Sequence, residues 1–101
     1  MVLYNVTVSV DQDIEQEWLT WMKEIHIPEV MNTGFFTKQR ILKMLNEQPD
    51  ATGMTYAIQY ELENIGKLDT YLQSSAPMLQ QKHLEQFGSK TMAFRTVLEE
   101  V

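Results

Sequence analysis

Four segments of the chain show the alternation of apolar and polar residues that is typical of β-strands. The clearest is 2–10, where apolar side chains occupy every second position. Alternation over 35–46, 54–62 and 90–99 predicts three further strands, although both alternating sets are mixed in the second. The turn-rich cluster 48–53 between the second and third strands predicts a hairpin loop.

Two segments between these strands have a helical period. The first places five apolar side chains on one helical face: Ile14, Trp18, Trp21, Met22 and Ile25. Pro28 is expected to end this helix, because proline disfavours helical geometry in the preceding residue. It can also open a short second turn over 29–32. The second segment, 63–87, is interrupted at 74–77, so it predicts one kinked helix or two stacked helices.

The predicted order is βαββαβ, with helical crossovers after the first and third strands. Right-handed crossovers place both helices on one face of the sheet. This is the ferredoxin-like plan of the α+β class, with a four-stranded antiparallel sheet in the order 4-1-3-2. At 101 residues, the whole chain 1–101 is expected to form one such domain.

The two faces of this sheet carry different side chains. One face is expected to meet the helices through Tyr4, Val6, Val8, Tyr56, Ile58, Tyr60 and Met92 or its neighbours. The other is expected to carry Leu3, Asn5, Thr7, Ala57, Gln59, Ala93, Arg95 and Val97. That second face could be open to water, or two copies could pack sheet against sheet. The predicted second and fourth strands are long, and overhanging ends favour the dimer.

Charge and composition limit the partners. The formal net charge is −6 and the sequence pI is about 4.7, so nucleic acid and anionic membranes are poor partners. The absence of cysteine excludes disulfides and thiolate chemistry. The N-terminus alternates like a strand, unlike a signal peptide, and no apolar run reaches the roughly 20 residues of a membrane helix. We therefore expect a cytoplasmic protein.

The chain resembles the dimeric α/β-barrel superfamily in the order of its elements and in a set of residues around the first helix. These residues are Trp18, Trp21, Met22, His26, Pro28, Glu29 and the segment 34–36. Within it, the chain looks most like a small bacterial family of uncharacterised proteins, a domain of unknown function. The resemblance implies a homodimer joined through its sheet faces, with a ligand cleft in each subunit between helices and sheet. Superfamily members include cofactor-free monooxygenases, lactone isomerases, sugar mutarotases and haem proteins, so the fold does not fix an activity.

His26 is the leading candidate for a functional residue. In the predicted topology, the end of the first helix returns beside Tyr4 and Tyr60, where an imidazole could serve as a general acid or base. It could instead be a structural histidine at a helix C-terminus. Aromatic residues could form the walls of a cleft for a small apolar or aromatic ligand, or they could be core: Tyr4, Trp18, Trp21, Tyr56 and Tyr60.

No metal or cofactor is expected. Glu29 follows His26 with the spacing of a metal-binding pair, but the expected helix end at Pro28 separates them. His83 is expected at the opposite end of the helix layer, about 20 Å away. Arg95 could grip a substrate carboxylate, as could Arg40, or both could pair with acidic residues.

Two functions remain open from the sequence. The first is a small-molecule enzyme or binder with a cleft between helices and sheet and His26 as its acid or base. The alternative is a non-catalytic dimeric module that binds a partner or regulates one.

Overall fold

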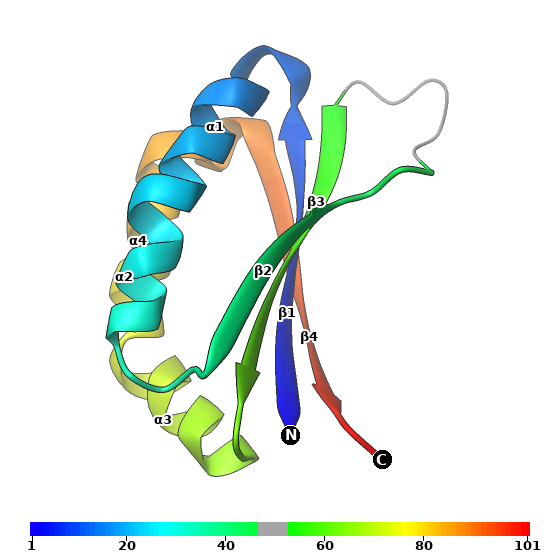
Figure 1. Ribbon diagram of the computed structural model, residues 1–101. Coiled ribbons are helices and arrows are strands. Elements are labelled where there is room, and N and C mark those ends of the chain that lie inside the picture. The colour runs from blue at the N-terminus through cyan, green and yellow to red at the C-terminus, as the bar shows by residue number, and fades with distance from the viewer. Residues whose placement is uncertain (47–52) are drawn as a thin grey trace.

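The computed structural model describes residues 1–46 and 53–101, and it is a four-stranded antiparallel sheet with helices on one face (Figure 1). The strands lie in the order β2-β3-β1-β4. Their bounds are β1 (Val2–Asp11), β2 (Lys38–Lys43), β3 (Gly53–Leu62) and β4 (Thr91–Glu99). The predicted ferredoxin-like order is therefore confirmed. The predicted hairpin at 48–53 lies outside the described residues, apart from Gly53, which begins β3.

The helices follow β1 and β3, as the sequence predicts. Those after β1 are η1 (Gln12–Ile14), α1 (Glu15–Trp21), η2 (Met22–His26) and α2 (Ile27–Asn32). Those after β3 are α3 (Ile65–Ser74), α4 (Ala76–Phe87) and the short η3 (Gly88–Lys90). The break between α3 and α4 falls at Ser75, which gives the two-helix form of the prediction. None of the described helices is long and apolar enough to cross a membrane.

Pro28 does not end the first helix, so that prediction is wrong. The chain passes from α1 through η2, a π-helical turn, directly into α2, and His26 and Ile27 both keep right-handed helical dihedral angles. Pro28 lies in the first turn of α2. Hydrogen bonding in the π-helical turn is already shifted by one residue, and a proline in a first turn lacks only a donor that the turn does not need. The helix ends instead at Asn32, and Gly34, just beyond the C-cap residue Thr33, takes a φ of +85°.

β2 is shorter than predicted and begins at Lys38 rather than residue 35. Its pairing with β3 starts opposite Glu61, one residue before β3 ends at Leu62, so the residues before Lys38 have little strand to pair with. Phe36 instead turns its ring into the core, where it is 6% exposed. β4 pairs with β1 along its whole length. The argument from overhanging strand ends therefore loses its basis.

The core lies between the helices and the sheet. Its most completely buried large side chains come from both layers: Val10, Trp18, Val30, Ile58, Leu62 and Leu68. Burying such a side chain contributes roughly 1.5–3 kcal/mol, so this layer holds the helices on the sheet. Among the described residues, the polar groups that reach this core belong to buried tyrosines and Trp18, and no charged residue is buried.

The two alternating sets of side chains on β4 lie on the opposite faces of the sheet from those expected. Its register places Arg95 opposite Val6, and directly opposed residues of an antiparallel pair share a face. Arg95 therefore lies on the helix side, whereas Met92 and Phe94 point away, 79% and 63% exposed. Both alternating sets of this strand contain apolar residues, so alternation could not choose between them. The register with β1 makes the choice.

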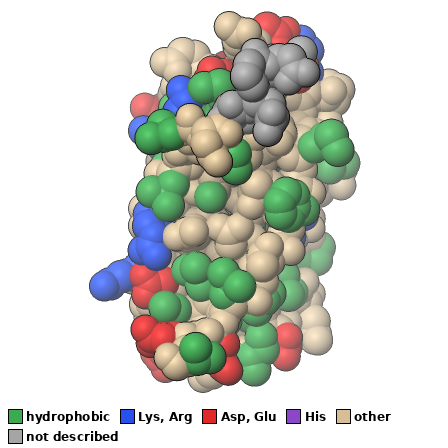
Figure 2. Space-filling model, turned by 90° about the vertical axis from the view of Figure 1, so that its right-hand side faces the viewer, with side chains coloured by type: hydrophobic (Ala, Val, Ile, Leu, Met, Phe, Trp, Pro, Cys, Tyr) green, Lys and Arg blue, Asp and Glu red, His purple; other side chains and the backbone are tan. Residues whose placement is uncertain are grey.

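The sheet surface away from the helices, here called the open face, is partly apolar. Figure 2 views it directly and shows apolar side chains distributed among polar ones. Its exposed apolar residues include Leu42, Met44, Met92, Phe94 and Leu98. Polar residues such as Arg40 lie between them, and Arg40 donates hydrogen bonds to Gln59 (2.8 Å) and Glu61 (3.2 Å).

Candidate functional site

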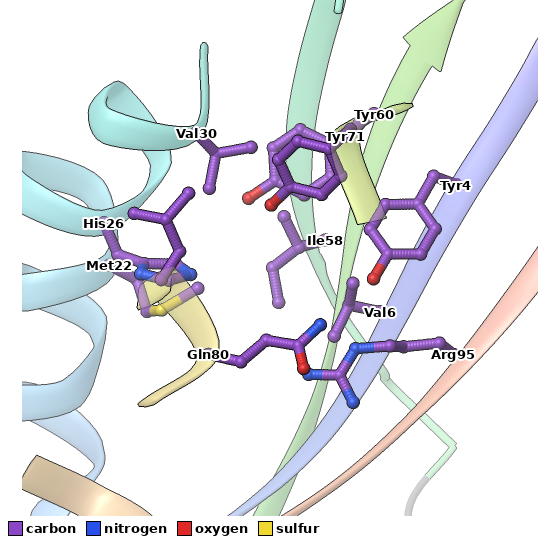
Figure 3. A pocket seen from close by; sticks show the side chains of 11 residues that line it. Tyr4, Val6, Met22, His26, Val30, Ile58, Tyr60, Tyr71, Gln80 and Arg95 are labelled. Carbon is purple, nitrogen blue, oxygen red and sulfur yellow. The ribbon is translucent and has the colours of Figure 1, made fainter. Parts of the chain in front are cut away.

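A small cavity lies between the helices and the sheet (Figure 3). Its volume is about 40 Å³, which is room for a few water-sized groups and much less than a drug-sized ligand fills. Side chains from both helical segments and from three strands line it: Tyr4, Val6, Met22, His26, Val30, Ile58, Tyr60, Tyr71, Leu79, Gln80 and Arg95. Polar groups from distant parts of the sequence thus meet on one cavity.

The π-helical turn brings His26 to this cavity. Met22, His26 and Val30 are spaced four residues apart and all line it. In a regular α-helix, residues four apart drift by about 40° around the axis. The wider turn of η2 opposes this drift, so the three side chains stay in one row (Figure 3). π-helical turns of this kind are frequent at functional sites.

The His26 imidazole is held neutral. Burial lowers its pKa to about 4, with a further contribution from the neighbouring His83. The ring stacks on Trp21, with ring centroids 5.0 Å apart and planes inclined by 21°. A neutral imidazole carries one donor and one acceptor nitrogen, so His26 can accept a proton or a hydrogen bond at pH 7.

His83 lies beside His26, and the expected 20 Å separation is wrong. Their ring centroids are 6.0 Å apart. The break at Ser75 leaves α4 alone to pack beside η2, and the first helix continues past Pro28, so both histidines lie within the layer rather than at its ends. Even so, no group of three His, Cys, Asp or Glu side chains among the described residues could hold a metal ion.

His83 accepts a hydrogen bond from the buried Trp18 of the core. The Trp18 indole Nε1 donates to His83 Nε2 over 2.9 Å. Burial lowers the pKa of His83, and the positive charge of Arg95 lowers it further. Because Nε2 accepts, the neutral ring carries its proton on Nδ1. This bond supplies the acceptor that the N–H of a buried tryptophan requires.

The hydroxyl groups of Tyr60 and Tyr71 face the cavity. Their side chains are only 3% and 4% exposed, and burial raises the pKa of both well above the ordinary value. Neither hydroxyl makes a hydrogen bond to another of the described residues. Every fully buried side-chain nitrogen or oxygen of those residues has a partner. The two hydroxyls therefore reach the cavity surface, where a bound group can meet them.

Tyr4, Gln80 and Arg95 form the other side of the cavity (Figure 3). Burial raises the pKa of the Tyr4 hydroxyl, whereas the charge of Arg95 and hydrogen bonding to Arg95 and Gln80 oppose that rise. Arg95 remains exposed, so it connects the buried hydroxyls with the solvent. The cavity thus has a neutral interior and a cationic rim.

The predicted site residues fall into two groups. Tyr4, His26 and Tyr60 line the cavity, and Trp21 stacks behind His26. The remaining two lie outside it. Trp18 is completely buried, and Tyr56 donates its hydroxyl to Glu15 over 2.5 Å.

Sequence reasoning missed two polar cavity residues and misplaced a third, Arg95, which it had named as a possible partner for a substrate carboxylate or for acidic residues. Tyr71 lies on the apolar stripe of its helix, so the stripe itself could have placed it against the sheet. Arg95 was assigned to the wrong face of β4. Gln80 follows the apolar Leu79 on α4 and carries no sequence signal that separates it from a surface residue.

Solved structures with this architecture are ferredoxin-like proteins of the antibiotic-biosynthesis-monooxygenase and EthD kinds. An ethyl tert-butyl ether d (EthD) family protein from Bacillus halodurans has a TM-score of 0.70 at 10% identity, with all of both chains covered. SnoaB, a cofactor-independent oxygenase from Streptomyces nogalater, has a TM-score of 0.67 at 8% identity, covering 98% of this chain and 92% of that one. A dimeric ferredoxin-like protein from an uncultured marine organism has a TM-score of 0.65 at 12% identity, covering 100% and 95%.

At such low identities the TM-scores show a shared ferredoxin-like fold and no shared activity. The chain itself belongs to the family described as a domain of unknown function, DUF4286, whose model matches residues 1–101. No curated protein matches the chain in sequence. The resemblance to a domain of unknown function is thereby confirmed, and the solved structures confirm the ferredoxin-like fold.

Proposed function

We propose that this protein binds a small molecule in the cavity between the helices and the sheet, with His26 as its proton-handling group. The observation that carries the proposal is the pair of hydroxyls on Tyr60 and Tyr71, which belong to buried side chains, open onto the cavity and have no partner among the described residues. Polar groups in a protein interior are normally hydrogen-bonded, so hydroxyls left open to a cavity are suited to a ligand.

The environment of His26 favours the role of a base over that of an acid. With a pKa of about 4, its ring is unprotonated at neutral pH and has no proton to donate as an imidazolium. It can accept a proton or orient a hydroxyl group of the ligand. Stacking on Trp21 fixes the ring plane, which limits the directions from which a ligand can approach.

Ligand screening by proton–nitrogen NMR tests this proposal. Small polar and aromatic compounds are titrated into the protein, and ligands are accepted when they shift the Met22 and Tyr71 signals together. The expected result is saturable binding that weakens in His26→Ala. A His26→Ala variant that keeps full affinity or turnover would remove His26 from the site. A screen that shifts no cavity residue would contradict the site itself.

The open face supports a homodimer in which two sheets pack together. It carries the exposed side chains of Leu42, Met92, Phe94 and Leu98. Burial of such apolar area is the main favourable term in protein association. A structural neighbour from an uncultured marine organism is described as dimeric. Together these observations support self-association through the open face.

A second candidate function is a non-catalytic dimeric module that binds a partner or regulates one. The small volume of the cavity, about 40 Å³, favours it, because most of a metabolite would have to remain outside. The screen above separates the two functions. A dimer that binds no ligand at the cavity would support the module.

A further inference from the structure

Arg95 carries a positive charge that no carboxylate neutralises among the described residues. The ion pairs of those residues are Arg40–Glu61, Lys43–Glu15, Lys67–Glu63, Lys82–Glu29 and Lys90–Asp13. Arg95 is in none of them. Lys23 and Lys38 are likewise in none of them, but of these three cations only Arg95 lines the cavity between the helices and the sheet.

The cavity beside Arg95 contains no acidic group. Its eleven lining residues are apolar, hydroxyl-bearing or amide-bearing, together with His26 and Arg95. The field of Arg95 reaches across the cavity, since its charge adds to the lowering of the His26 pKa and offsets part of the rise in the pKa values of Tyr4 and Tyr71. The cavity therefore favours negative charge on the side of Arg95 and has no carboxylate among its lining residues, although Glu29 nearby acts on His26 in the opposite sense.

Hydrogen-bond donors surround the same space. The hydroxyls of Tyr60 and Tyr71 lie on one side, and the guanidinium of Arg95 and the amide of Gln80 lie on the other (Figure 3). A guanidinium presents several N–H groups in a plane that matches the two oxygens of a carboxylate. The unpartnered hydroxyls can donate to the same oxygens.

We propose that the ligand is a small organic acid whose carboxylate, or an equivalent oxyanion, is held between Arg95 and the hydroxyls of Tyr60 and Tyr71. This inference rests on the proposed function and names its ligand class. The volume of about 40 Å³ suits the head group alone. The rest of the ligand extends outward over the exposed side of β4, where Ala93 and Val97 flank Arg95.

Matched acids and amides test the ligand class directly. Acetate and acetamide probe the head group, and benzoate and benzamide probe the head group with an apolar extension. Binding is followed by NMR titration of the Arg95 side-chain Nε–H and the Tyr71 ring. We expect each acid to bind tighter than its amide by about tenfold or more, because hydrogen bonds to charged groups are the stronger ones.

Variants separate the charge from the fold. Arg95→Gln should weaken acetate and benzoate binding by about tenfold or more, and Arg95→Lys should retain part of the affinity. Arg40→Gln is the matched control, because Arg40 lies on the open face and pairs with Glu61. It should leave acid binding unchanged. Retained amide signals at other cavity residues would show that Arg95→Gln is folded.

The outcomes distinguish this inference from the proposed function. If amides bind as tightly as acids and Arg95→Gln has no effect, the anion inference is wrong while the cavity remains a ligand site. If acids bind but shift only residues away from the cavity, the inference is also wrong. If neither acids nor amides bind and the broader screen also fails, both are overturned.

Discussion

At the scale of single residues, burial decides the chemistry of this protein more than formal charge does. His26 and His83 are both held neutral, chiefly because their rings are partly buried and also because of the positive charge of Arg95. The tyrosine hydroxyls of the cavity are likewise held in their protonated form. The site therefore presents neutral donors and acceptors around one exposed cation.

The pKa of His26 makes stability depend on pH. Its folded-state value of about 4 lies below the ordinary 6.5, so the unfolded chain takes up the proton first as the pH falls. The stabilising contribution is complete above pH 6.5 and is lost between there and about pH 4. The full shift corresponds to roughly 3 kcal/mol, and solvent screening of the partly exposed ring reduces the expected loss to on the order of 2 kcal/mol, to which His83 adds in the same direction.

Urea unfolding followed across this pH range measures the effect. In His26→Gln, which cannot titrate here, the decline between pH 6.5 and 4 should be shallower than in the parent protein. Direct titration of the His26 ring by NMR gives an independent value. Equal slopes in the two proteins, or a His26 pKa near 6.5, would contradict the neutral buried ring.

Removal of tyrosine hydroxyls should affect stability and binding in opposite ways. Tyr56→Phe loses a bond to the Glu15 carboxylate outside the cavity, so it should cost about 1–2 kcal/mol and leave ligand binding intact. Tyr60→Phe and Tyr71→Phe remove hydroxyls with no partner among the described residues. They should be neutral or slightly stabilising in denaturant unfolding while weakening acid binding. A large destabilisation by Tyr71→Phe would indicate a partner for its hydroxyl.

At the scale of elements, the first helix is organised by its π-helical turn and by the way it ends. The turn accommodates Pro28 and keeps His26 in a row with Met22 and Val30. At the other end, Gly34 takes a positive φ of 85° and donates its N–H to Met31 over 3.2 Å. That turn directs the chain into β2, so the aromatic residues before β2 reach the core.

The loss of stability on substituting Gly34 should depend only on how readily the new residue adopts a positive φ. A Cβ at this position would meet no atom within 4 Å, so crowding does not contribute. We expect Gly34→Ala to destabilise the protein by about 1 kcal/mol, because alanine disfavours a positive φ. Gly34→Asn should cost less, since asparagine enters this region more readily. Equal losses for both variants in thermal unfolding would show that another effect dominates.

At the scale of the whole molecule, the two faces of the sheet have separate tasks. One face carries the helices and the cavity, and the open face is left with exposed apolar residues. β4 belongs to both, because Arg95 points to the cavity while its neighbour Phe94 points to the open face. In the proposed dimer, the strand that bears the anion-binding arginine is therefore also part of the subunit contact.

The proposed dimer should respond to charge on the open face. Phe94→Lys places a charge where two sheets would meet, and burial of an unpaired charge is strongly unfavourable. We expect light scattering to report a dimer for the parent protein and a monomer for this variant. Leu84→Lys is the matched control, because Leu84 is equally exposed, at 64%, but lies on α4 in the helix layer. A parent protein that stays monomeric at high concentration would contradict the dimer.

Sequence reasoning recovered most of the fold and part of the cavity. Alternation and helical period located all four strands and both helical segments, and crossover handedness fixed their order. Sequence reasoning failed where a rule about neighbouring residues was overridden by structure elsewhere in the chain. Pro28 usually breaks a helix, yet the π-helical turn before it removes the conflict. The second strand was predicted too long because its partner ends at Leu62. The alternation of residues within the second strand does not indicate where its partner strand ends.

The sequence by itself determined the layers of this protein, because burial of alternating and helical stripes requires only local periodicity. It also pointed to His26, Tyr4 and Tyr60 through topology. Only the tertiary structure decided the face of Arg95, since both sides of β4 are mixed and the register with β1 makes the choice. It also decided the proximity of His26 and His83, because helix packing sets distances that the spacing of residues along a chain does not contain.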